Sequence, residues 1–542
     1  MTTSPWPRTH HEVIRHYYDV YDKDLEAGRF QPFLYPWGTF GALVVIVYLL
    51  IPHQHRPWLR KARFLAFAWI TGFAAYSIKF TRARGMAPAF GLGLISAWSI
   101  IWIMSIIVVN DAQTDFQRIE RMEGLFGKSL EEQDGPAAIL NGLHSNEQHT
   151  NGSAKTHVSN DEAHPHEKLG PSKRHGGFAW QPYPMTPFIE RLDWVLDIFC
   201  NFRGAGWNWR TSTISPPPKP IQEQLHRNSA TSPSHSARVH PNQPRAYTTR
   251  RSLLIANTKT FIIGYLILDS LKTLINHDPY FWGFIDRKPP SYFPSLLTQN
   301  DVLLRIYHLT ISLFAIKWAL QTIFALAPLF FSGFLGPIAI GARAEPWMYP
   351  ETWGPFTSIL DRGLAGWWSV WWHQTFRFAF EQPSRKVVKL LGMNPRAPLA
   401  KFLQLVIAFG LSGTLHACGS YTSAGTTYPL SGSMLFFLLQ ALGIFTEVVV
   451  TQGLRRTGIQ ERVPQALMRV FTFVYVHVWF YYTAPLLCDE FARGGIWLFE
   501  PVPVSILRGL GLGVEGDGWW CWGGKLVWWH TGDRWWRSGL AF

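Results

Sequence analysis

Residues 402–416 read FLQLVIAFGLSGTLH, an apolar run that ends in the imidazole of His416. An aromatic segment at residues 367–374, WWSVWWHQ, precedes it and carries a second imidazole, His373. Ionisable side chains are costly at membrane depth, and those that occur there usually have a function. We therefore expect the two histidines to mark the centre of the protein and the rest of the chain to be arranged around them.

Composition indicates a membrane protein. Hydrophobic residues make up 47% of the 542 residues, charged residues only 16%, and there are 27 Trp. Runs of about 20 apolar residues match the thickness of the bilayer core. The fold class that we predict is an all-α polytopic membrane protein with roughly eight or nine transmembrane helices, interfacial helices and a long disordered polar insert.

Hydropathy divides the chain into five parts. They are a polar lead (1–32), N-terminal transmembrane helices (33–110), a largely disordered insert (111–252) with an amphipathic helix near 187–200, a transmembrane core (253–515) and a Trp-rich tail (516–542). The apolar runs lie at about 35–52, 64–80, 87–109, 253–275, 302–331, 399–418, 432–452, 466–487 and, more weakly, 494–512. Residues 128–176 and 211–250 are too polar to fold alone.

A net charge of +14 has three explanations. Nucleic acid would explain it, but the basic residues flank apolar runs, as cytoplasmic loops of membrane proteins do. A polyanion such as CoA is the third explanation, and no nucleic-acid partner is expected. The four Cys form no CxxC pair and the histidines of 144–175 are irregularly spaced. We therefore expect free thiols, no metal site and no permanently bound cofactor.

Several polar residues could carry chemistry. A neutral imidazole can take a proton from an alcohol, so His416 is a candidate general base and His373 a candidate electrophile, with Gln374 as a second donor. The alternative is a hydrogen-bonded core histidine and an interfacial histidine among Trp rings. Asp269 and Glu447 are acids within apolar runs, and Asp269 could pair with Lys272. The cations that could bind CoA phosphates are Arg377, Arg385, Lys386, Lys389 and Arg396, and the alternative is that they only flank the apolar runs on the cytoplasmic side.

The order of these motifs resembles the wax synthase-like domain of the membrane-bound O-acyltransferase (MBOAT) class. Trp372-His373-Gln374 is similar to its WHQ segment, and residues 412–416 (SGTLH) to its SGxxH segment. Residues 436–440 (FFLLQ), followed by Glu447, resemble its FFxxQ…E helix. Residues 203–209 (RGAGWNW) resemble a segment common in filamentous-fungal members. One departure is the sequence SVW at 369–371, where the family often has Gly-Arg-Arg.

The resemblance, strongest over about 345–490, implies a fold and a function. The fold would be MBOAT-like, in a multi-pass protein of the endoplasmic reticulum. It would transfer an acyl group, with acetyl favoured, from acyl-CoA to a lipophilic alcohol, as similar fungal O-acetyltransferases of terpenoids and meroterpenoids do. His416 and His373 would be catalytic, and Trp372, Gln374, Arg377, Arg385, Lys386, Gln440 and Glu447 would bind substrate or CoA. A wax-ester synthase of long-chain alcohols and a transporter of lipids or small molecules are the alternatives.

Overall fold

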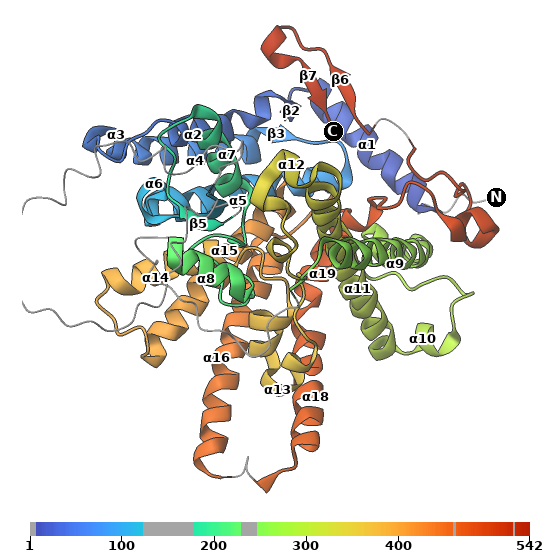
Figure 1. The fold of residues 1–542 in the computed structure, drawn as a ribbon. Coiled ribbons are helices and arrows are strands. Elements are labelled where there is room, and N and C mark those ends of the chain that lie inside the picture. The colour runs from blue at the N-terminus through green and yellow to red at the C-terminus, as the bar shows by residue number, and fades with distance from the viewer. Residues whose placement is uncertain (1–6, 123–176, 229–245, 459–461, 524–525) are drawn as a thin grey trace, which may run out of the picture.

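Helices dominate the chain. The computed structural model describes residues 7–122, 177–228, 246–458, 462–523 and 526–542 (Figure 1). The helices of eight or more residues are α1 His10–Glu26, α2 Phe40–Leu50, α4 Arg63–Phe80, α5 Met86–Ile103, α7 Phe188–Cys200, α8 Lys219–Asn228, α9 Arg250–His277, α11 Asp301–Pro328, α13 Thr357–Gly366, α14 Arg377–Leu390, α15 Pro398–Thr422, α16 Leu435–Arg456, α18 Gln465–Thr483 and α19 Pro485–Arg493.

Short helices and strands complete the described chain. The short α-helices are α3 Pro57–Lys61, α6 Ala112–Asp115, α10 Ser295–Gln299 and α12 Gly336–Ile340; the π-helical turns used below are η8 Trp367–Trp371 and η9 Leu430–Met434. The strands are β1 Gln31–Pro32, β2 Leu34–Tyr35, β3 Thr81–Arg82, β4 Arg118–Arg121, β5 Phe178–Gln181, β6 Trp528–His530 and β7 Gly539–Ala541. They pair as β1-β3, β2-β7-β6 and β4-β5.

Fewer helices could cross a membrane than the sequence predicts. In the described chain five continuous helices are long and apolar enough: Met86–Val109, Arg250–His277, Asp301–Ala344, Pro398–Thr422 and Leu430–Arg456. The pair α18 and α19, bent by 42°, would be a sixth. The expected total of eight or nine is not confirmed. The run at 35–52 forms the 11-residue α2, about 16 Å long and too short for the roughly 30 Å bilayer core.

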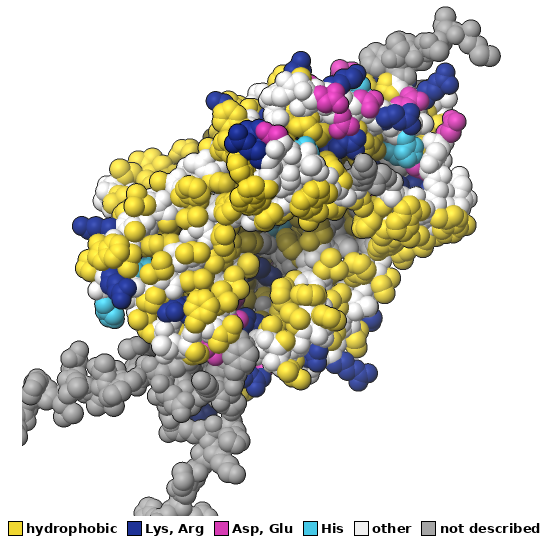
Figure 2. All heavy atoms as spheres, turned by 90° about the horizontal axis from the view of Figure 1, so that it is seen from above, with side chains coloured by type: hydrophobic (Ala, Val, Ile, Leu, Met, Phe, Trp, Pro, Cys, Tyr) yellow, Lys and Arg dark blue, Asp and Glu magenta, His cyan; other side chains and the backbone are white. Residues whose placement is uncertain are grey.

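The outer surface agrees with a membrane location. Figure 2 shows hydrophobic side chains over most of one face, with charged side chains gathered toward one end. Large apolar side chains are exposed along the helices that would cross the bilayer, among them Ile263 on α9, Phe314 on α11 and Val449 on α16. Soluble proteins rarely expose contiguous apolar surface on this scale. The chain is therefore an integral membrane protein.

The polar insert is more ordered than its composition suggests. β4 and β5 pair antiparallel, with Arg118 opposite Gln181, and α7 buries Trp194, Val195 and Ile198 within the protein. The expectation that residues 211–250 lack structure is wrong for 211–228, because α8 packs through Ile221 and Leu225. The histidine-rich stretch 144–175 and residues 229–245 lie outside the described residues.

A buried charge network holds this region together. The Arg118 side chain is 1% exposed and pairs with Asp193 at 2.6 Å, and Arg343 pairs with Glu120 at 2.7 Å. Burial alone would raise the pKa of Glu120, but the Arg343 and Arg118 guanidinium groups hold it below its ordinary value. Buried charges persist only when paired in this way. The network therefore joins the β4-β5 sheet and α7 to the end of the span that begins with α11.

A close contact with α5 positions the helix that carries His416. α5 and α15 approach at Gly93, where a Cβ atom would overlap the carbonyl oxygen of Cys418. Thr422 Oγ1 donates to the carbonyl of Ala89 at 2.7 Å and accepts from the Gly93 amide at 3.0 Å. Small residues allow membrane helices to pack this closely. The close packing of α15 against α5 therefore requires glycine at position 93.

We predict that Gly93→Ala destabilises the protein, while Gly91→Ala does not. A Cβ at Gly93 meets backbone, whereas a Cβ at Gly91 meets nothing within 4 Å. Overpacking costs about 1–3 kcal/mol, and both changes gain up to about 1 kcal/mol of helix propensity. Thermal unfolding in detergent, followed by Trp fluorescence, should show a lower midpoint for Gly93→Ala alone. Equal midpoints for the two variants would refute this account of the α5–α15 contact.

Candidate active site

One large cavity lies among the helices of the transmembrane core. Its volume is about 1410 Å³, and its wall includes residues of α5, α11, α14, α15, α16, α18 and α19. His416 and His373 both line it, as do Trp372, Gln374, Arg377 and Arg385. The structure therefore brings together six of the nine site residues that the sequence predicts.

His416 projects from α15 between aromatic rings. Its imidazole stacks on Phe437 of α16, with ring centroids 4.7 Å apart and planes 19° apart. Phe90 of α5 and Phe491 of α19 each lie 6.3 Å from it. The Nδ1 atom is buried without a hydrogen-bond partner. Apolar rings thus surround the imidazole, and no group among the described residues is hydrogen-bonded to its Nδ1 atom.

His373 lies in the turn between η8 and α14. Trp353, Phe324 and Phe376 surround its ring at centroid distances of 5.9, 5.9 and 5.6 Å. Its Nδ1 atom is also buried without a partner. Burial, with smaller contributions from the nearby His416 and Arg203, lowers the pKa of His373 to about 3. The ring is therefore neutral over the physiological range.

Gln374 shapes the turn that holds His373. Its Nε2 atom donates to the backbone carbonyls of Trp368, at 3.0 Å, and Trp372. Its Oε1 atom accepts from Arg377 Nη1 at 3.1 Å. Backbone carbonyls thus occupy the amide donors that we expected to face a substrate. In this arrangement Gln374 positions its neighbours.

The predicted cations divide into two groups. Arg377 and Arg385 line the cavity, and Glu381 on the same helix pairs with both, at 2.7 Å from Arg385 Nη2. Lys401, at the start of α15, also lines the cavity. Lys386 is exposed and does not line it. Lys389 and Arg396 do not line it either, so two of the five predicted cations are placed to meet an anion that enters the cavity.

Gln440 and Glu447 support the cavity wall from behind. Gln440 is fully buried, and its Oε1 atom accepts from the indole N–H groups of Trp368, at 3.4 Å, and Trp479, at 3.2 Å. Glu447 accepts from the backbone N–H of Leu364 at 2.8 Å. It lies against Gly363, whose φ of +56° interrupts α13. Neither residue lines the cavity, so the structure gives both a positioning role.

Arg203 is a residue near the site that sequence reasoning missed. Its guanidinium donates to the carbonyls of Pro350, at 3.0 Å, and Glu351, at 2.9 Å. It therefore ties residues 203–209 to the loop that brings Trp353 against His373. The motif RGAGWNW was noticed only as a family resemblance. The sequence feature that could have identified Arg203 is the position of an arginine between two apolar segments.

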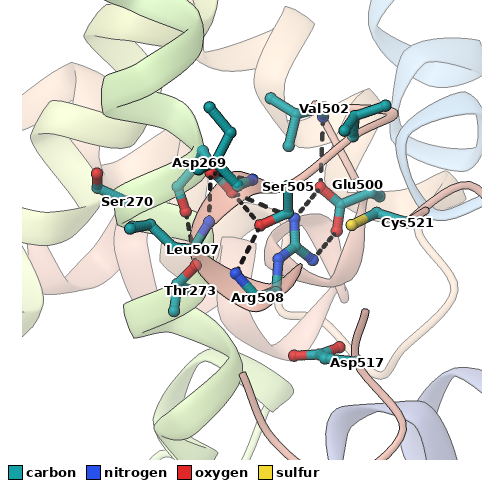
Figure 3. A network of polar contacts seen from close by, with 12 residues as sticks. Asp269, Ser270, Thr273, Glu500, Val502, Ser505, Leu507, Arg508, Asp517 and Cys521 are labelled. Atoms are coloured by element: carbon teal, nitrogen blue, oxygen red, sulfur yellow. Dashed lines mark hydrogen bonds and ion pairs between the residues drawn. The ribbon is translucent and has the colours of Figure 1, made fainter. Parts of the chain in front are cut away.

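Asp269 is not paired as predicted. Its carboxylate accepts from Ser505 Oγ and from the backbone N–H of Ile506 at 2.9 Å, and Arg508 lies 3.8 Å away (Figure 3). Lys272 instead donates to the carbonyl of Trp497 at 2.6 Å. The predicted Asp269–Lys272 ion pair is therefore wrong, because the C-terminal segment supplies fixed donors to the acid.

Comparison with known proteins supports the resemblance. The model of the membrane bound O-acyl transferase family matches residues 349–439, which include His373 and His416. Relatives include the acetyltransferase ple2 of Rhodocybe pseudopiperita (26% identity, covering 55% of this chain and 66% of the relative), the O-mevalon transferase macI of Penicillium terrestre (26%, 48% and 53%) and the acetyltransferase aurG of Calcarisporium arbuscula (27%, 44% and 56%).

These matches are partial in length. The chain spans between about half and two thirds of the length of the relatives just named. No solved structure matches the chain. The resemblance to membrane-bound O-acyltransferases is therefore confirmed over residues 349–439, which contribute His373, His416 and part of the cavity wall.

We predict that Gln440→Leu destabilises the protein by about 2 kcal/mol, because it leaves two partly buried indole N–H groups without an acceptor. Gln404→Leu is the matched control, since Gln404 lines the cavity and makes no hydrogen bond to the described residues. Chemical unfolding in detergent measures both. The positioning role of Gln440 is wrong if the two variants are equally stable.

Proposed function

We propose that the protein is a membrane-embedded O-acyltransferase. It would move an acyl group, most simply acetyl, from acyl-CoA to a hydroxyl group of a lipophilic, terpenoid-type acceptor. The observation that carries this proposal is the presence of two imidazoles in the wall of one largely apolar cavity, each with a buried Nδ1 atom that has no partner.

The chemistry requires a base and a polarised carbonyl. An alcohol attacks a thioester slowly until its proton is removed, and a neutral imidazole can accept that proton. His416 takes this role because the aromatic rings around it hold it at the cavity wall. The alcohol oxygen bonds to the thioester carbon, the carbon–sulfur bond breaks, and the proton on His416 passes to the departing CoA thiolate. His373, in the wall of the same cavity, takes the role of donor to the oxyanion in this proposal.

The transfer is direct in this scheme. A covalent route would need an activated thiol. Among the described residues Cys488 lines the cavity, but it is a buried thiol with no histidine hydrogen-bonded to it. A ternary complex of acyl-CoA, acceptor and enzyme therefore accounts for the arrangement with fewer steps.

The cavity is large enough for two substrates. Its volume of about 1410 Å³ exceeds the roughly 300–1,000 Å³ of pockets that hold one drug-sized ligand. Trp368, Phe409 and Phe437 give its wall an apolar, aromatic character suited to a polycyclic or isoprenoid acceptor. Relatives named as an acetyltransferase and an O-mevalon transferase support the transfer of an acyl group.

Basic side chains in the cavity wall are suited to binding the acyl-CoA donor. Arg377, Arg385 and Lys401 line it, and guanidinium groups bind phosphate through charge-assisted hydrogen bonds. Arg377 Nη1 also donates to the carbonyl of Ser369 at 3.0 Å, within the segment that departs from the family pattern. This contact fixes Arg377 beside η8 where the family often supplies further arginines.

A transporter is less consistent with the contacts. Coupled transport would use Asp269 and Glu447 as titratable groups in the membrane. Fixed backbone N–H donors bind both carboxylates, from Ile506 in one case and Leu364 in the other. Such contacts hold an acid in place and leave it poorly suited to bind and release an ion.

His416→Ala should lower kcat about 10²- to 10⁴-fold, the usual contribution of a general base. Membranes containing the full chain would be supplied with labelled acetyl-CoA and terpenoid alcohols, and ester would be quantified. His55→Ala is the control, since that side chain is exposed and does not line the cavity. Ester formation by His416→Ala at the wild-type rate and protein level would eliminate the base assignment.

Arg385→Ala should raise KM for acyl-CoA about fivefold with little change in kcat, because a cavity-lining but exposed cation contributes roughly 1 kcal/mol. Lys386→Ala is the matched neighbour outside the cavity wall and should change KM less. The effect of Arg385→Ala should shrink at high salt. Equal KM values for the two variants would move the CoA site away from α14.

A further inference from the structure

A second cluster of histidines lies away from the cavity, where the two ends of the chain meet. His10 and His11 open α1, and Asp517 belongs to the loop after residue 512. The Nε2 atom of His11 lies 3.0 Å from Asp517 Oδ1, and that of His10 lies 3.6 Å from it. One potential ligand atom from each of these side chains falls within 4.8 Å of the others.

We propose that His10, His11 and Asp517 bind a divalent transition-metal ion of the zinc type. Zinc binds imidazole nitrogen and carboxylate oxygen at about 2.0–2.1 Å in tetrahedral geometry, which places ligand atoms about 3.3–3.4 Å apart. The measured separations of 3.0 and 3.6 Å bracket that value. Two neutral nitrogens and one carboxylate suit zinc better than calcium or magnesium, which prefer oxygen ligands.

The carboxylate of Asp517 is available to such an ion. Arg508 pairs with Glu500 at 2.6 Å, and Lys272 is hydrogen-bonded to the carbonyl of Trp497. Figure 3 shows Asp517 apart from the dashed contacts of Arg508. Among the described residues no Lys or Arg lies within 4.0 Å of the Asp517 carboxylate, which pairs only with the two histidines. No directly contacting Lys or Arg among the described residues would therefore compete with a metal ion for this carboxylate.

Unpartnered polar atoms are a second indication of a ligand. His10 is 3% exposed, its contact with Asp517 is too long for a hydrogen bond, and its Nδ1 atom is buried without a partner. Asn276 is fully buried beside Asp517, and its Oδ1 atom is also without a partner. Buried polar groups normally have partners. A metal ion would give the Nε2 atom of His10 a partner that Asp517 does not supply, and a metal-bound water could donate to Asn276 Oδ1.

The loop is shaped around this position. Val514 N donates to Asp517 Oδ2 at 3.2 Å, and Asp517 N donates to the carbonyl of Val514 at 3.0 Å. Gly516 has a φ of +92°, and a Cβ there would lie 3.2 Å from His11 Cδ2. Only glycine adopts this conformation readily and lets the His11 ring approach so closely. The His11 side chain is 39% exposed, which leaves a path for the ion.

A bound metal ion would cross-link the start of α1 to the C-terminal loop that carries Asp517. Val13 of α1 packs in the same buried cluster as Trp282, Phe491 and Trp497. Phe491 lies against His416, and Trp497 lines the large cavity. An ion that fixes the start of α1 would therefore stabilise the packing of Phe491 and Trp497 beside His416, and it would not contact a substrate.

The test compares variants of the full chain purified in detergent, stripped with a chelator and dialysed. Bound metal is measured by elemental analysis after zinc addition and gel filtration, and stability by thermal unfolding. The variants are His11→Ala and Asp517→Asn, with His16→Ala as the control, an exposed histidine of the same helix. His11→Cys keeps a zinc ligand at this position. Every variant retains the histidines of 144–175, so differences between variants report this site alone.

We expect wild type and His16→Ala to retain about one zinc ion per chain more than His11→Ala or Asp517→Asn. Zinc should raise the unfolding midpoint of the first two and not of the last two, and His11→Cys should regain both effects. The proposal is overturned if His11→Ala and His16→Ala hold equal amounts of zinc. It is also overturned if the wild-type chain holds none.

Discussion

Polar side chains in an apolar, membrane-spanning interior must find partners, and this requirement organises the structure. Gln440 meets it with two indole N–H groups, Glu447 with the N–H of Leu364, and Asp269 with the donors of residues 505–507. Each contact joins segments far apart in the sequence. The contacts of Gln440 and Glu447 support the aromatic wall of the cavity, and those of Asp269 hold α9 to the C-terminal segment. His373 and His416 differ from these three side chains, because both line the cavity and the Nδ1 atom of each has no hydrogen-bond partner.

A separate set of contacts positions each of the two histidines. α5 and α15 meet at Gly93 and set the position of His416. Residues 203–209 and the loop around Trp353 meet at Arg203 and set the position of His373. Because these supports come from separate parts of the chain, the relative placement of the two imidazoles depends on the whole fold. An acyl transfer that needs a base on one side of the thioester and a donor on the other would depend on it too.

Much of this arrangement could be predicted from the sequence, and the limits have physical causes. Apolar runs such as 399–418 are recognisable because bilayer thickness sets their length, and the helix found there is α15. α2 shows the limit of that signal, since hydropathy does not reveal that a helix ends after 11 residues. Likewise α8 is polar in composition, and its order depends on contacts that Ile221 and Leu225 make with distant residues. Motif resemblance located His373 and His416, whereas long-range contacts, invisible in sequence, decided that Gln440 supports the wall and Arg203 lies near the site.

The central claim is that His416 accepts the proton of an acceptor hydroxyl beside a bound thioester. The most direct measurement is an experimental structure of the full chain in lipid nanodiscs with a non-hydrolysable acetyl-CoA analogue and a terpenoid alcohol. The account predicts the hydroxyl within hydrogen-bonding distance of the His416 ring and the acyl carbonyl facing His373. A donor bound outside this cavity, with lipid filling the space beside His416, would contradict it.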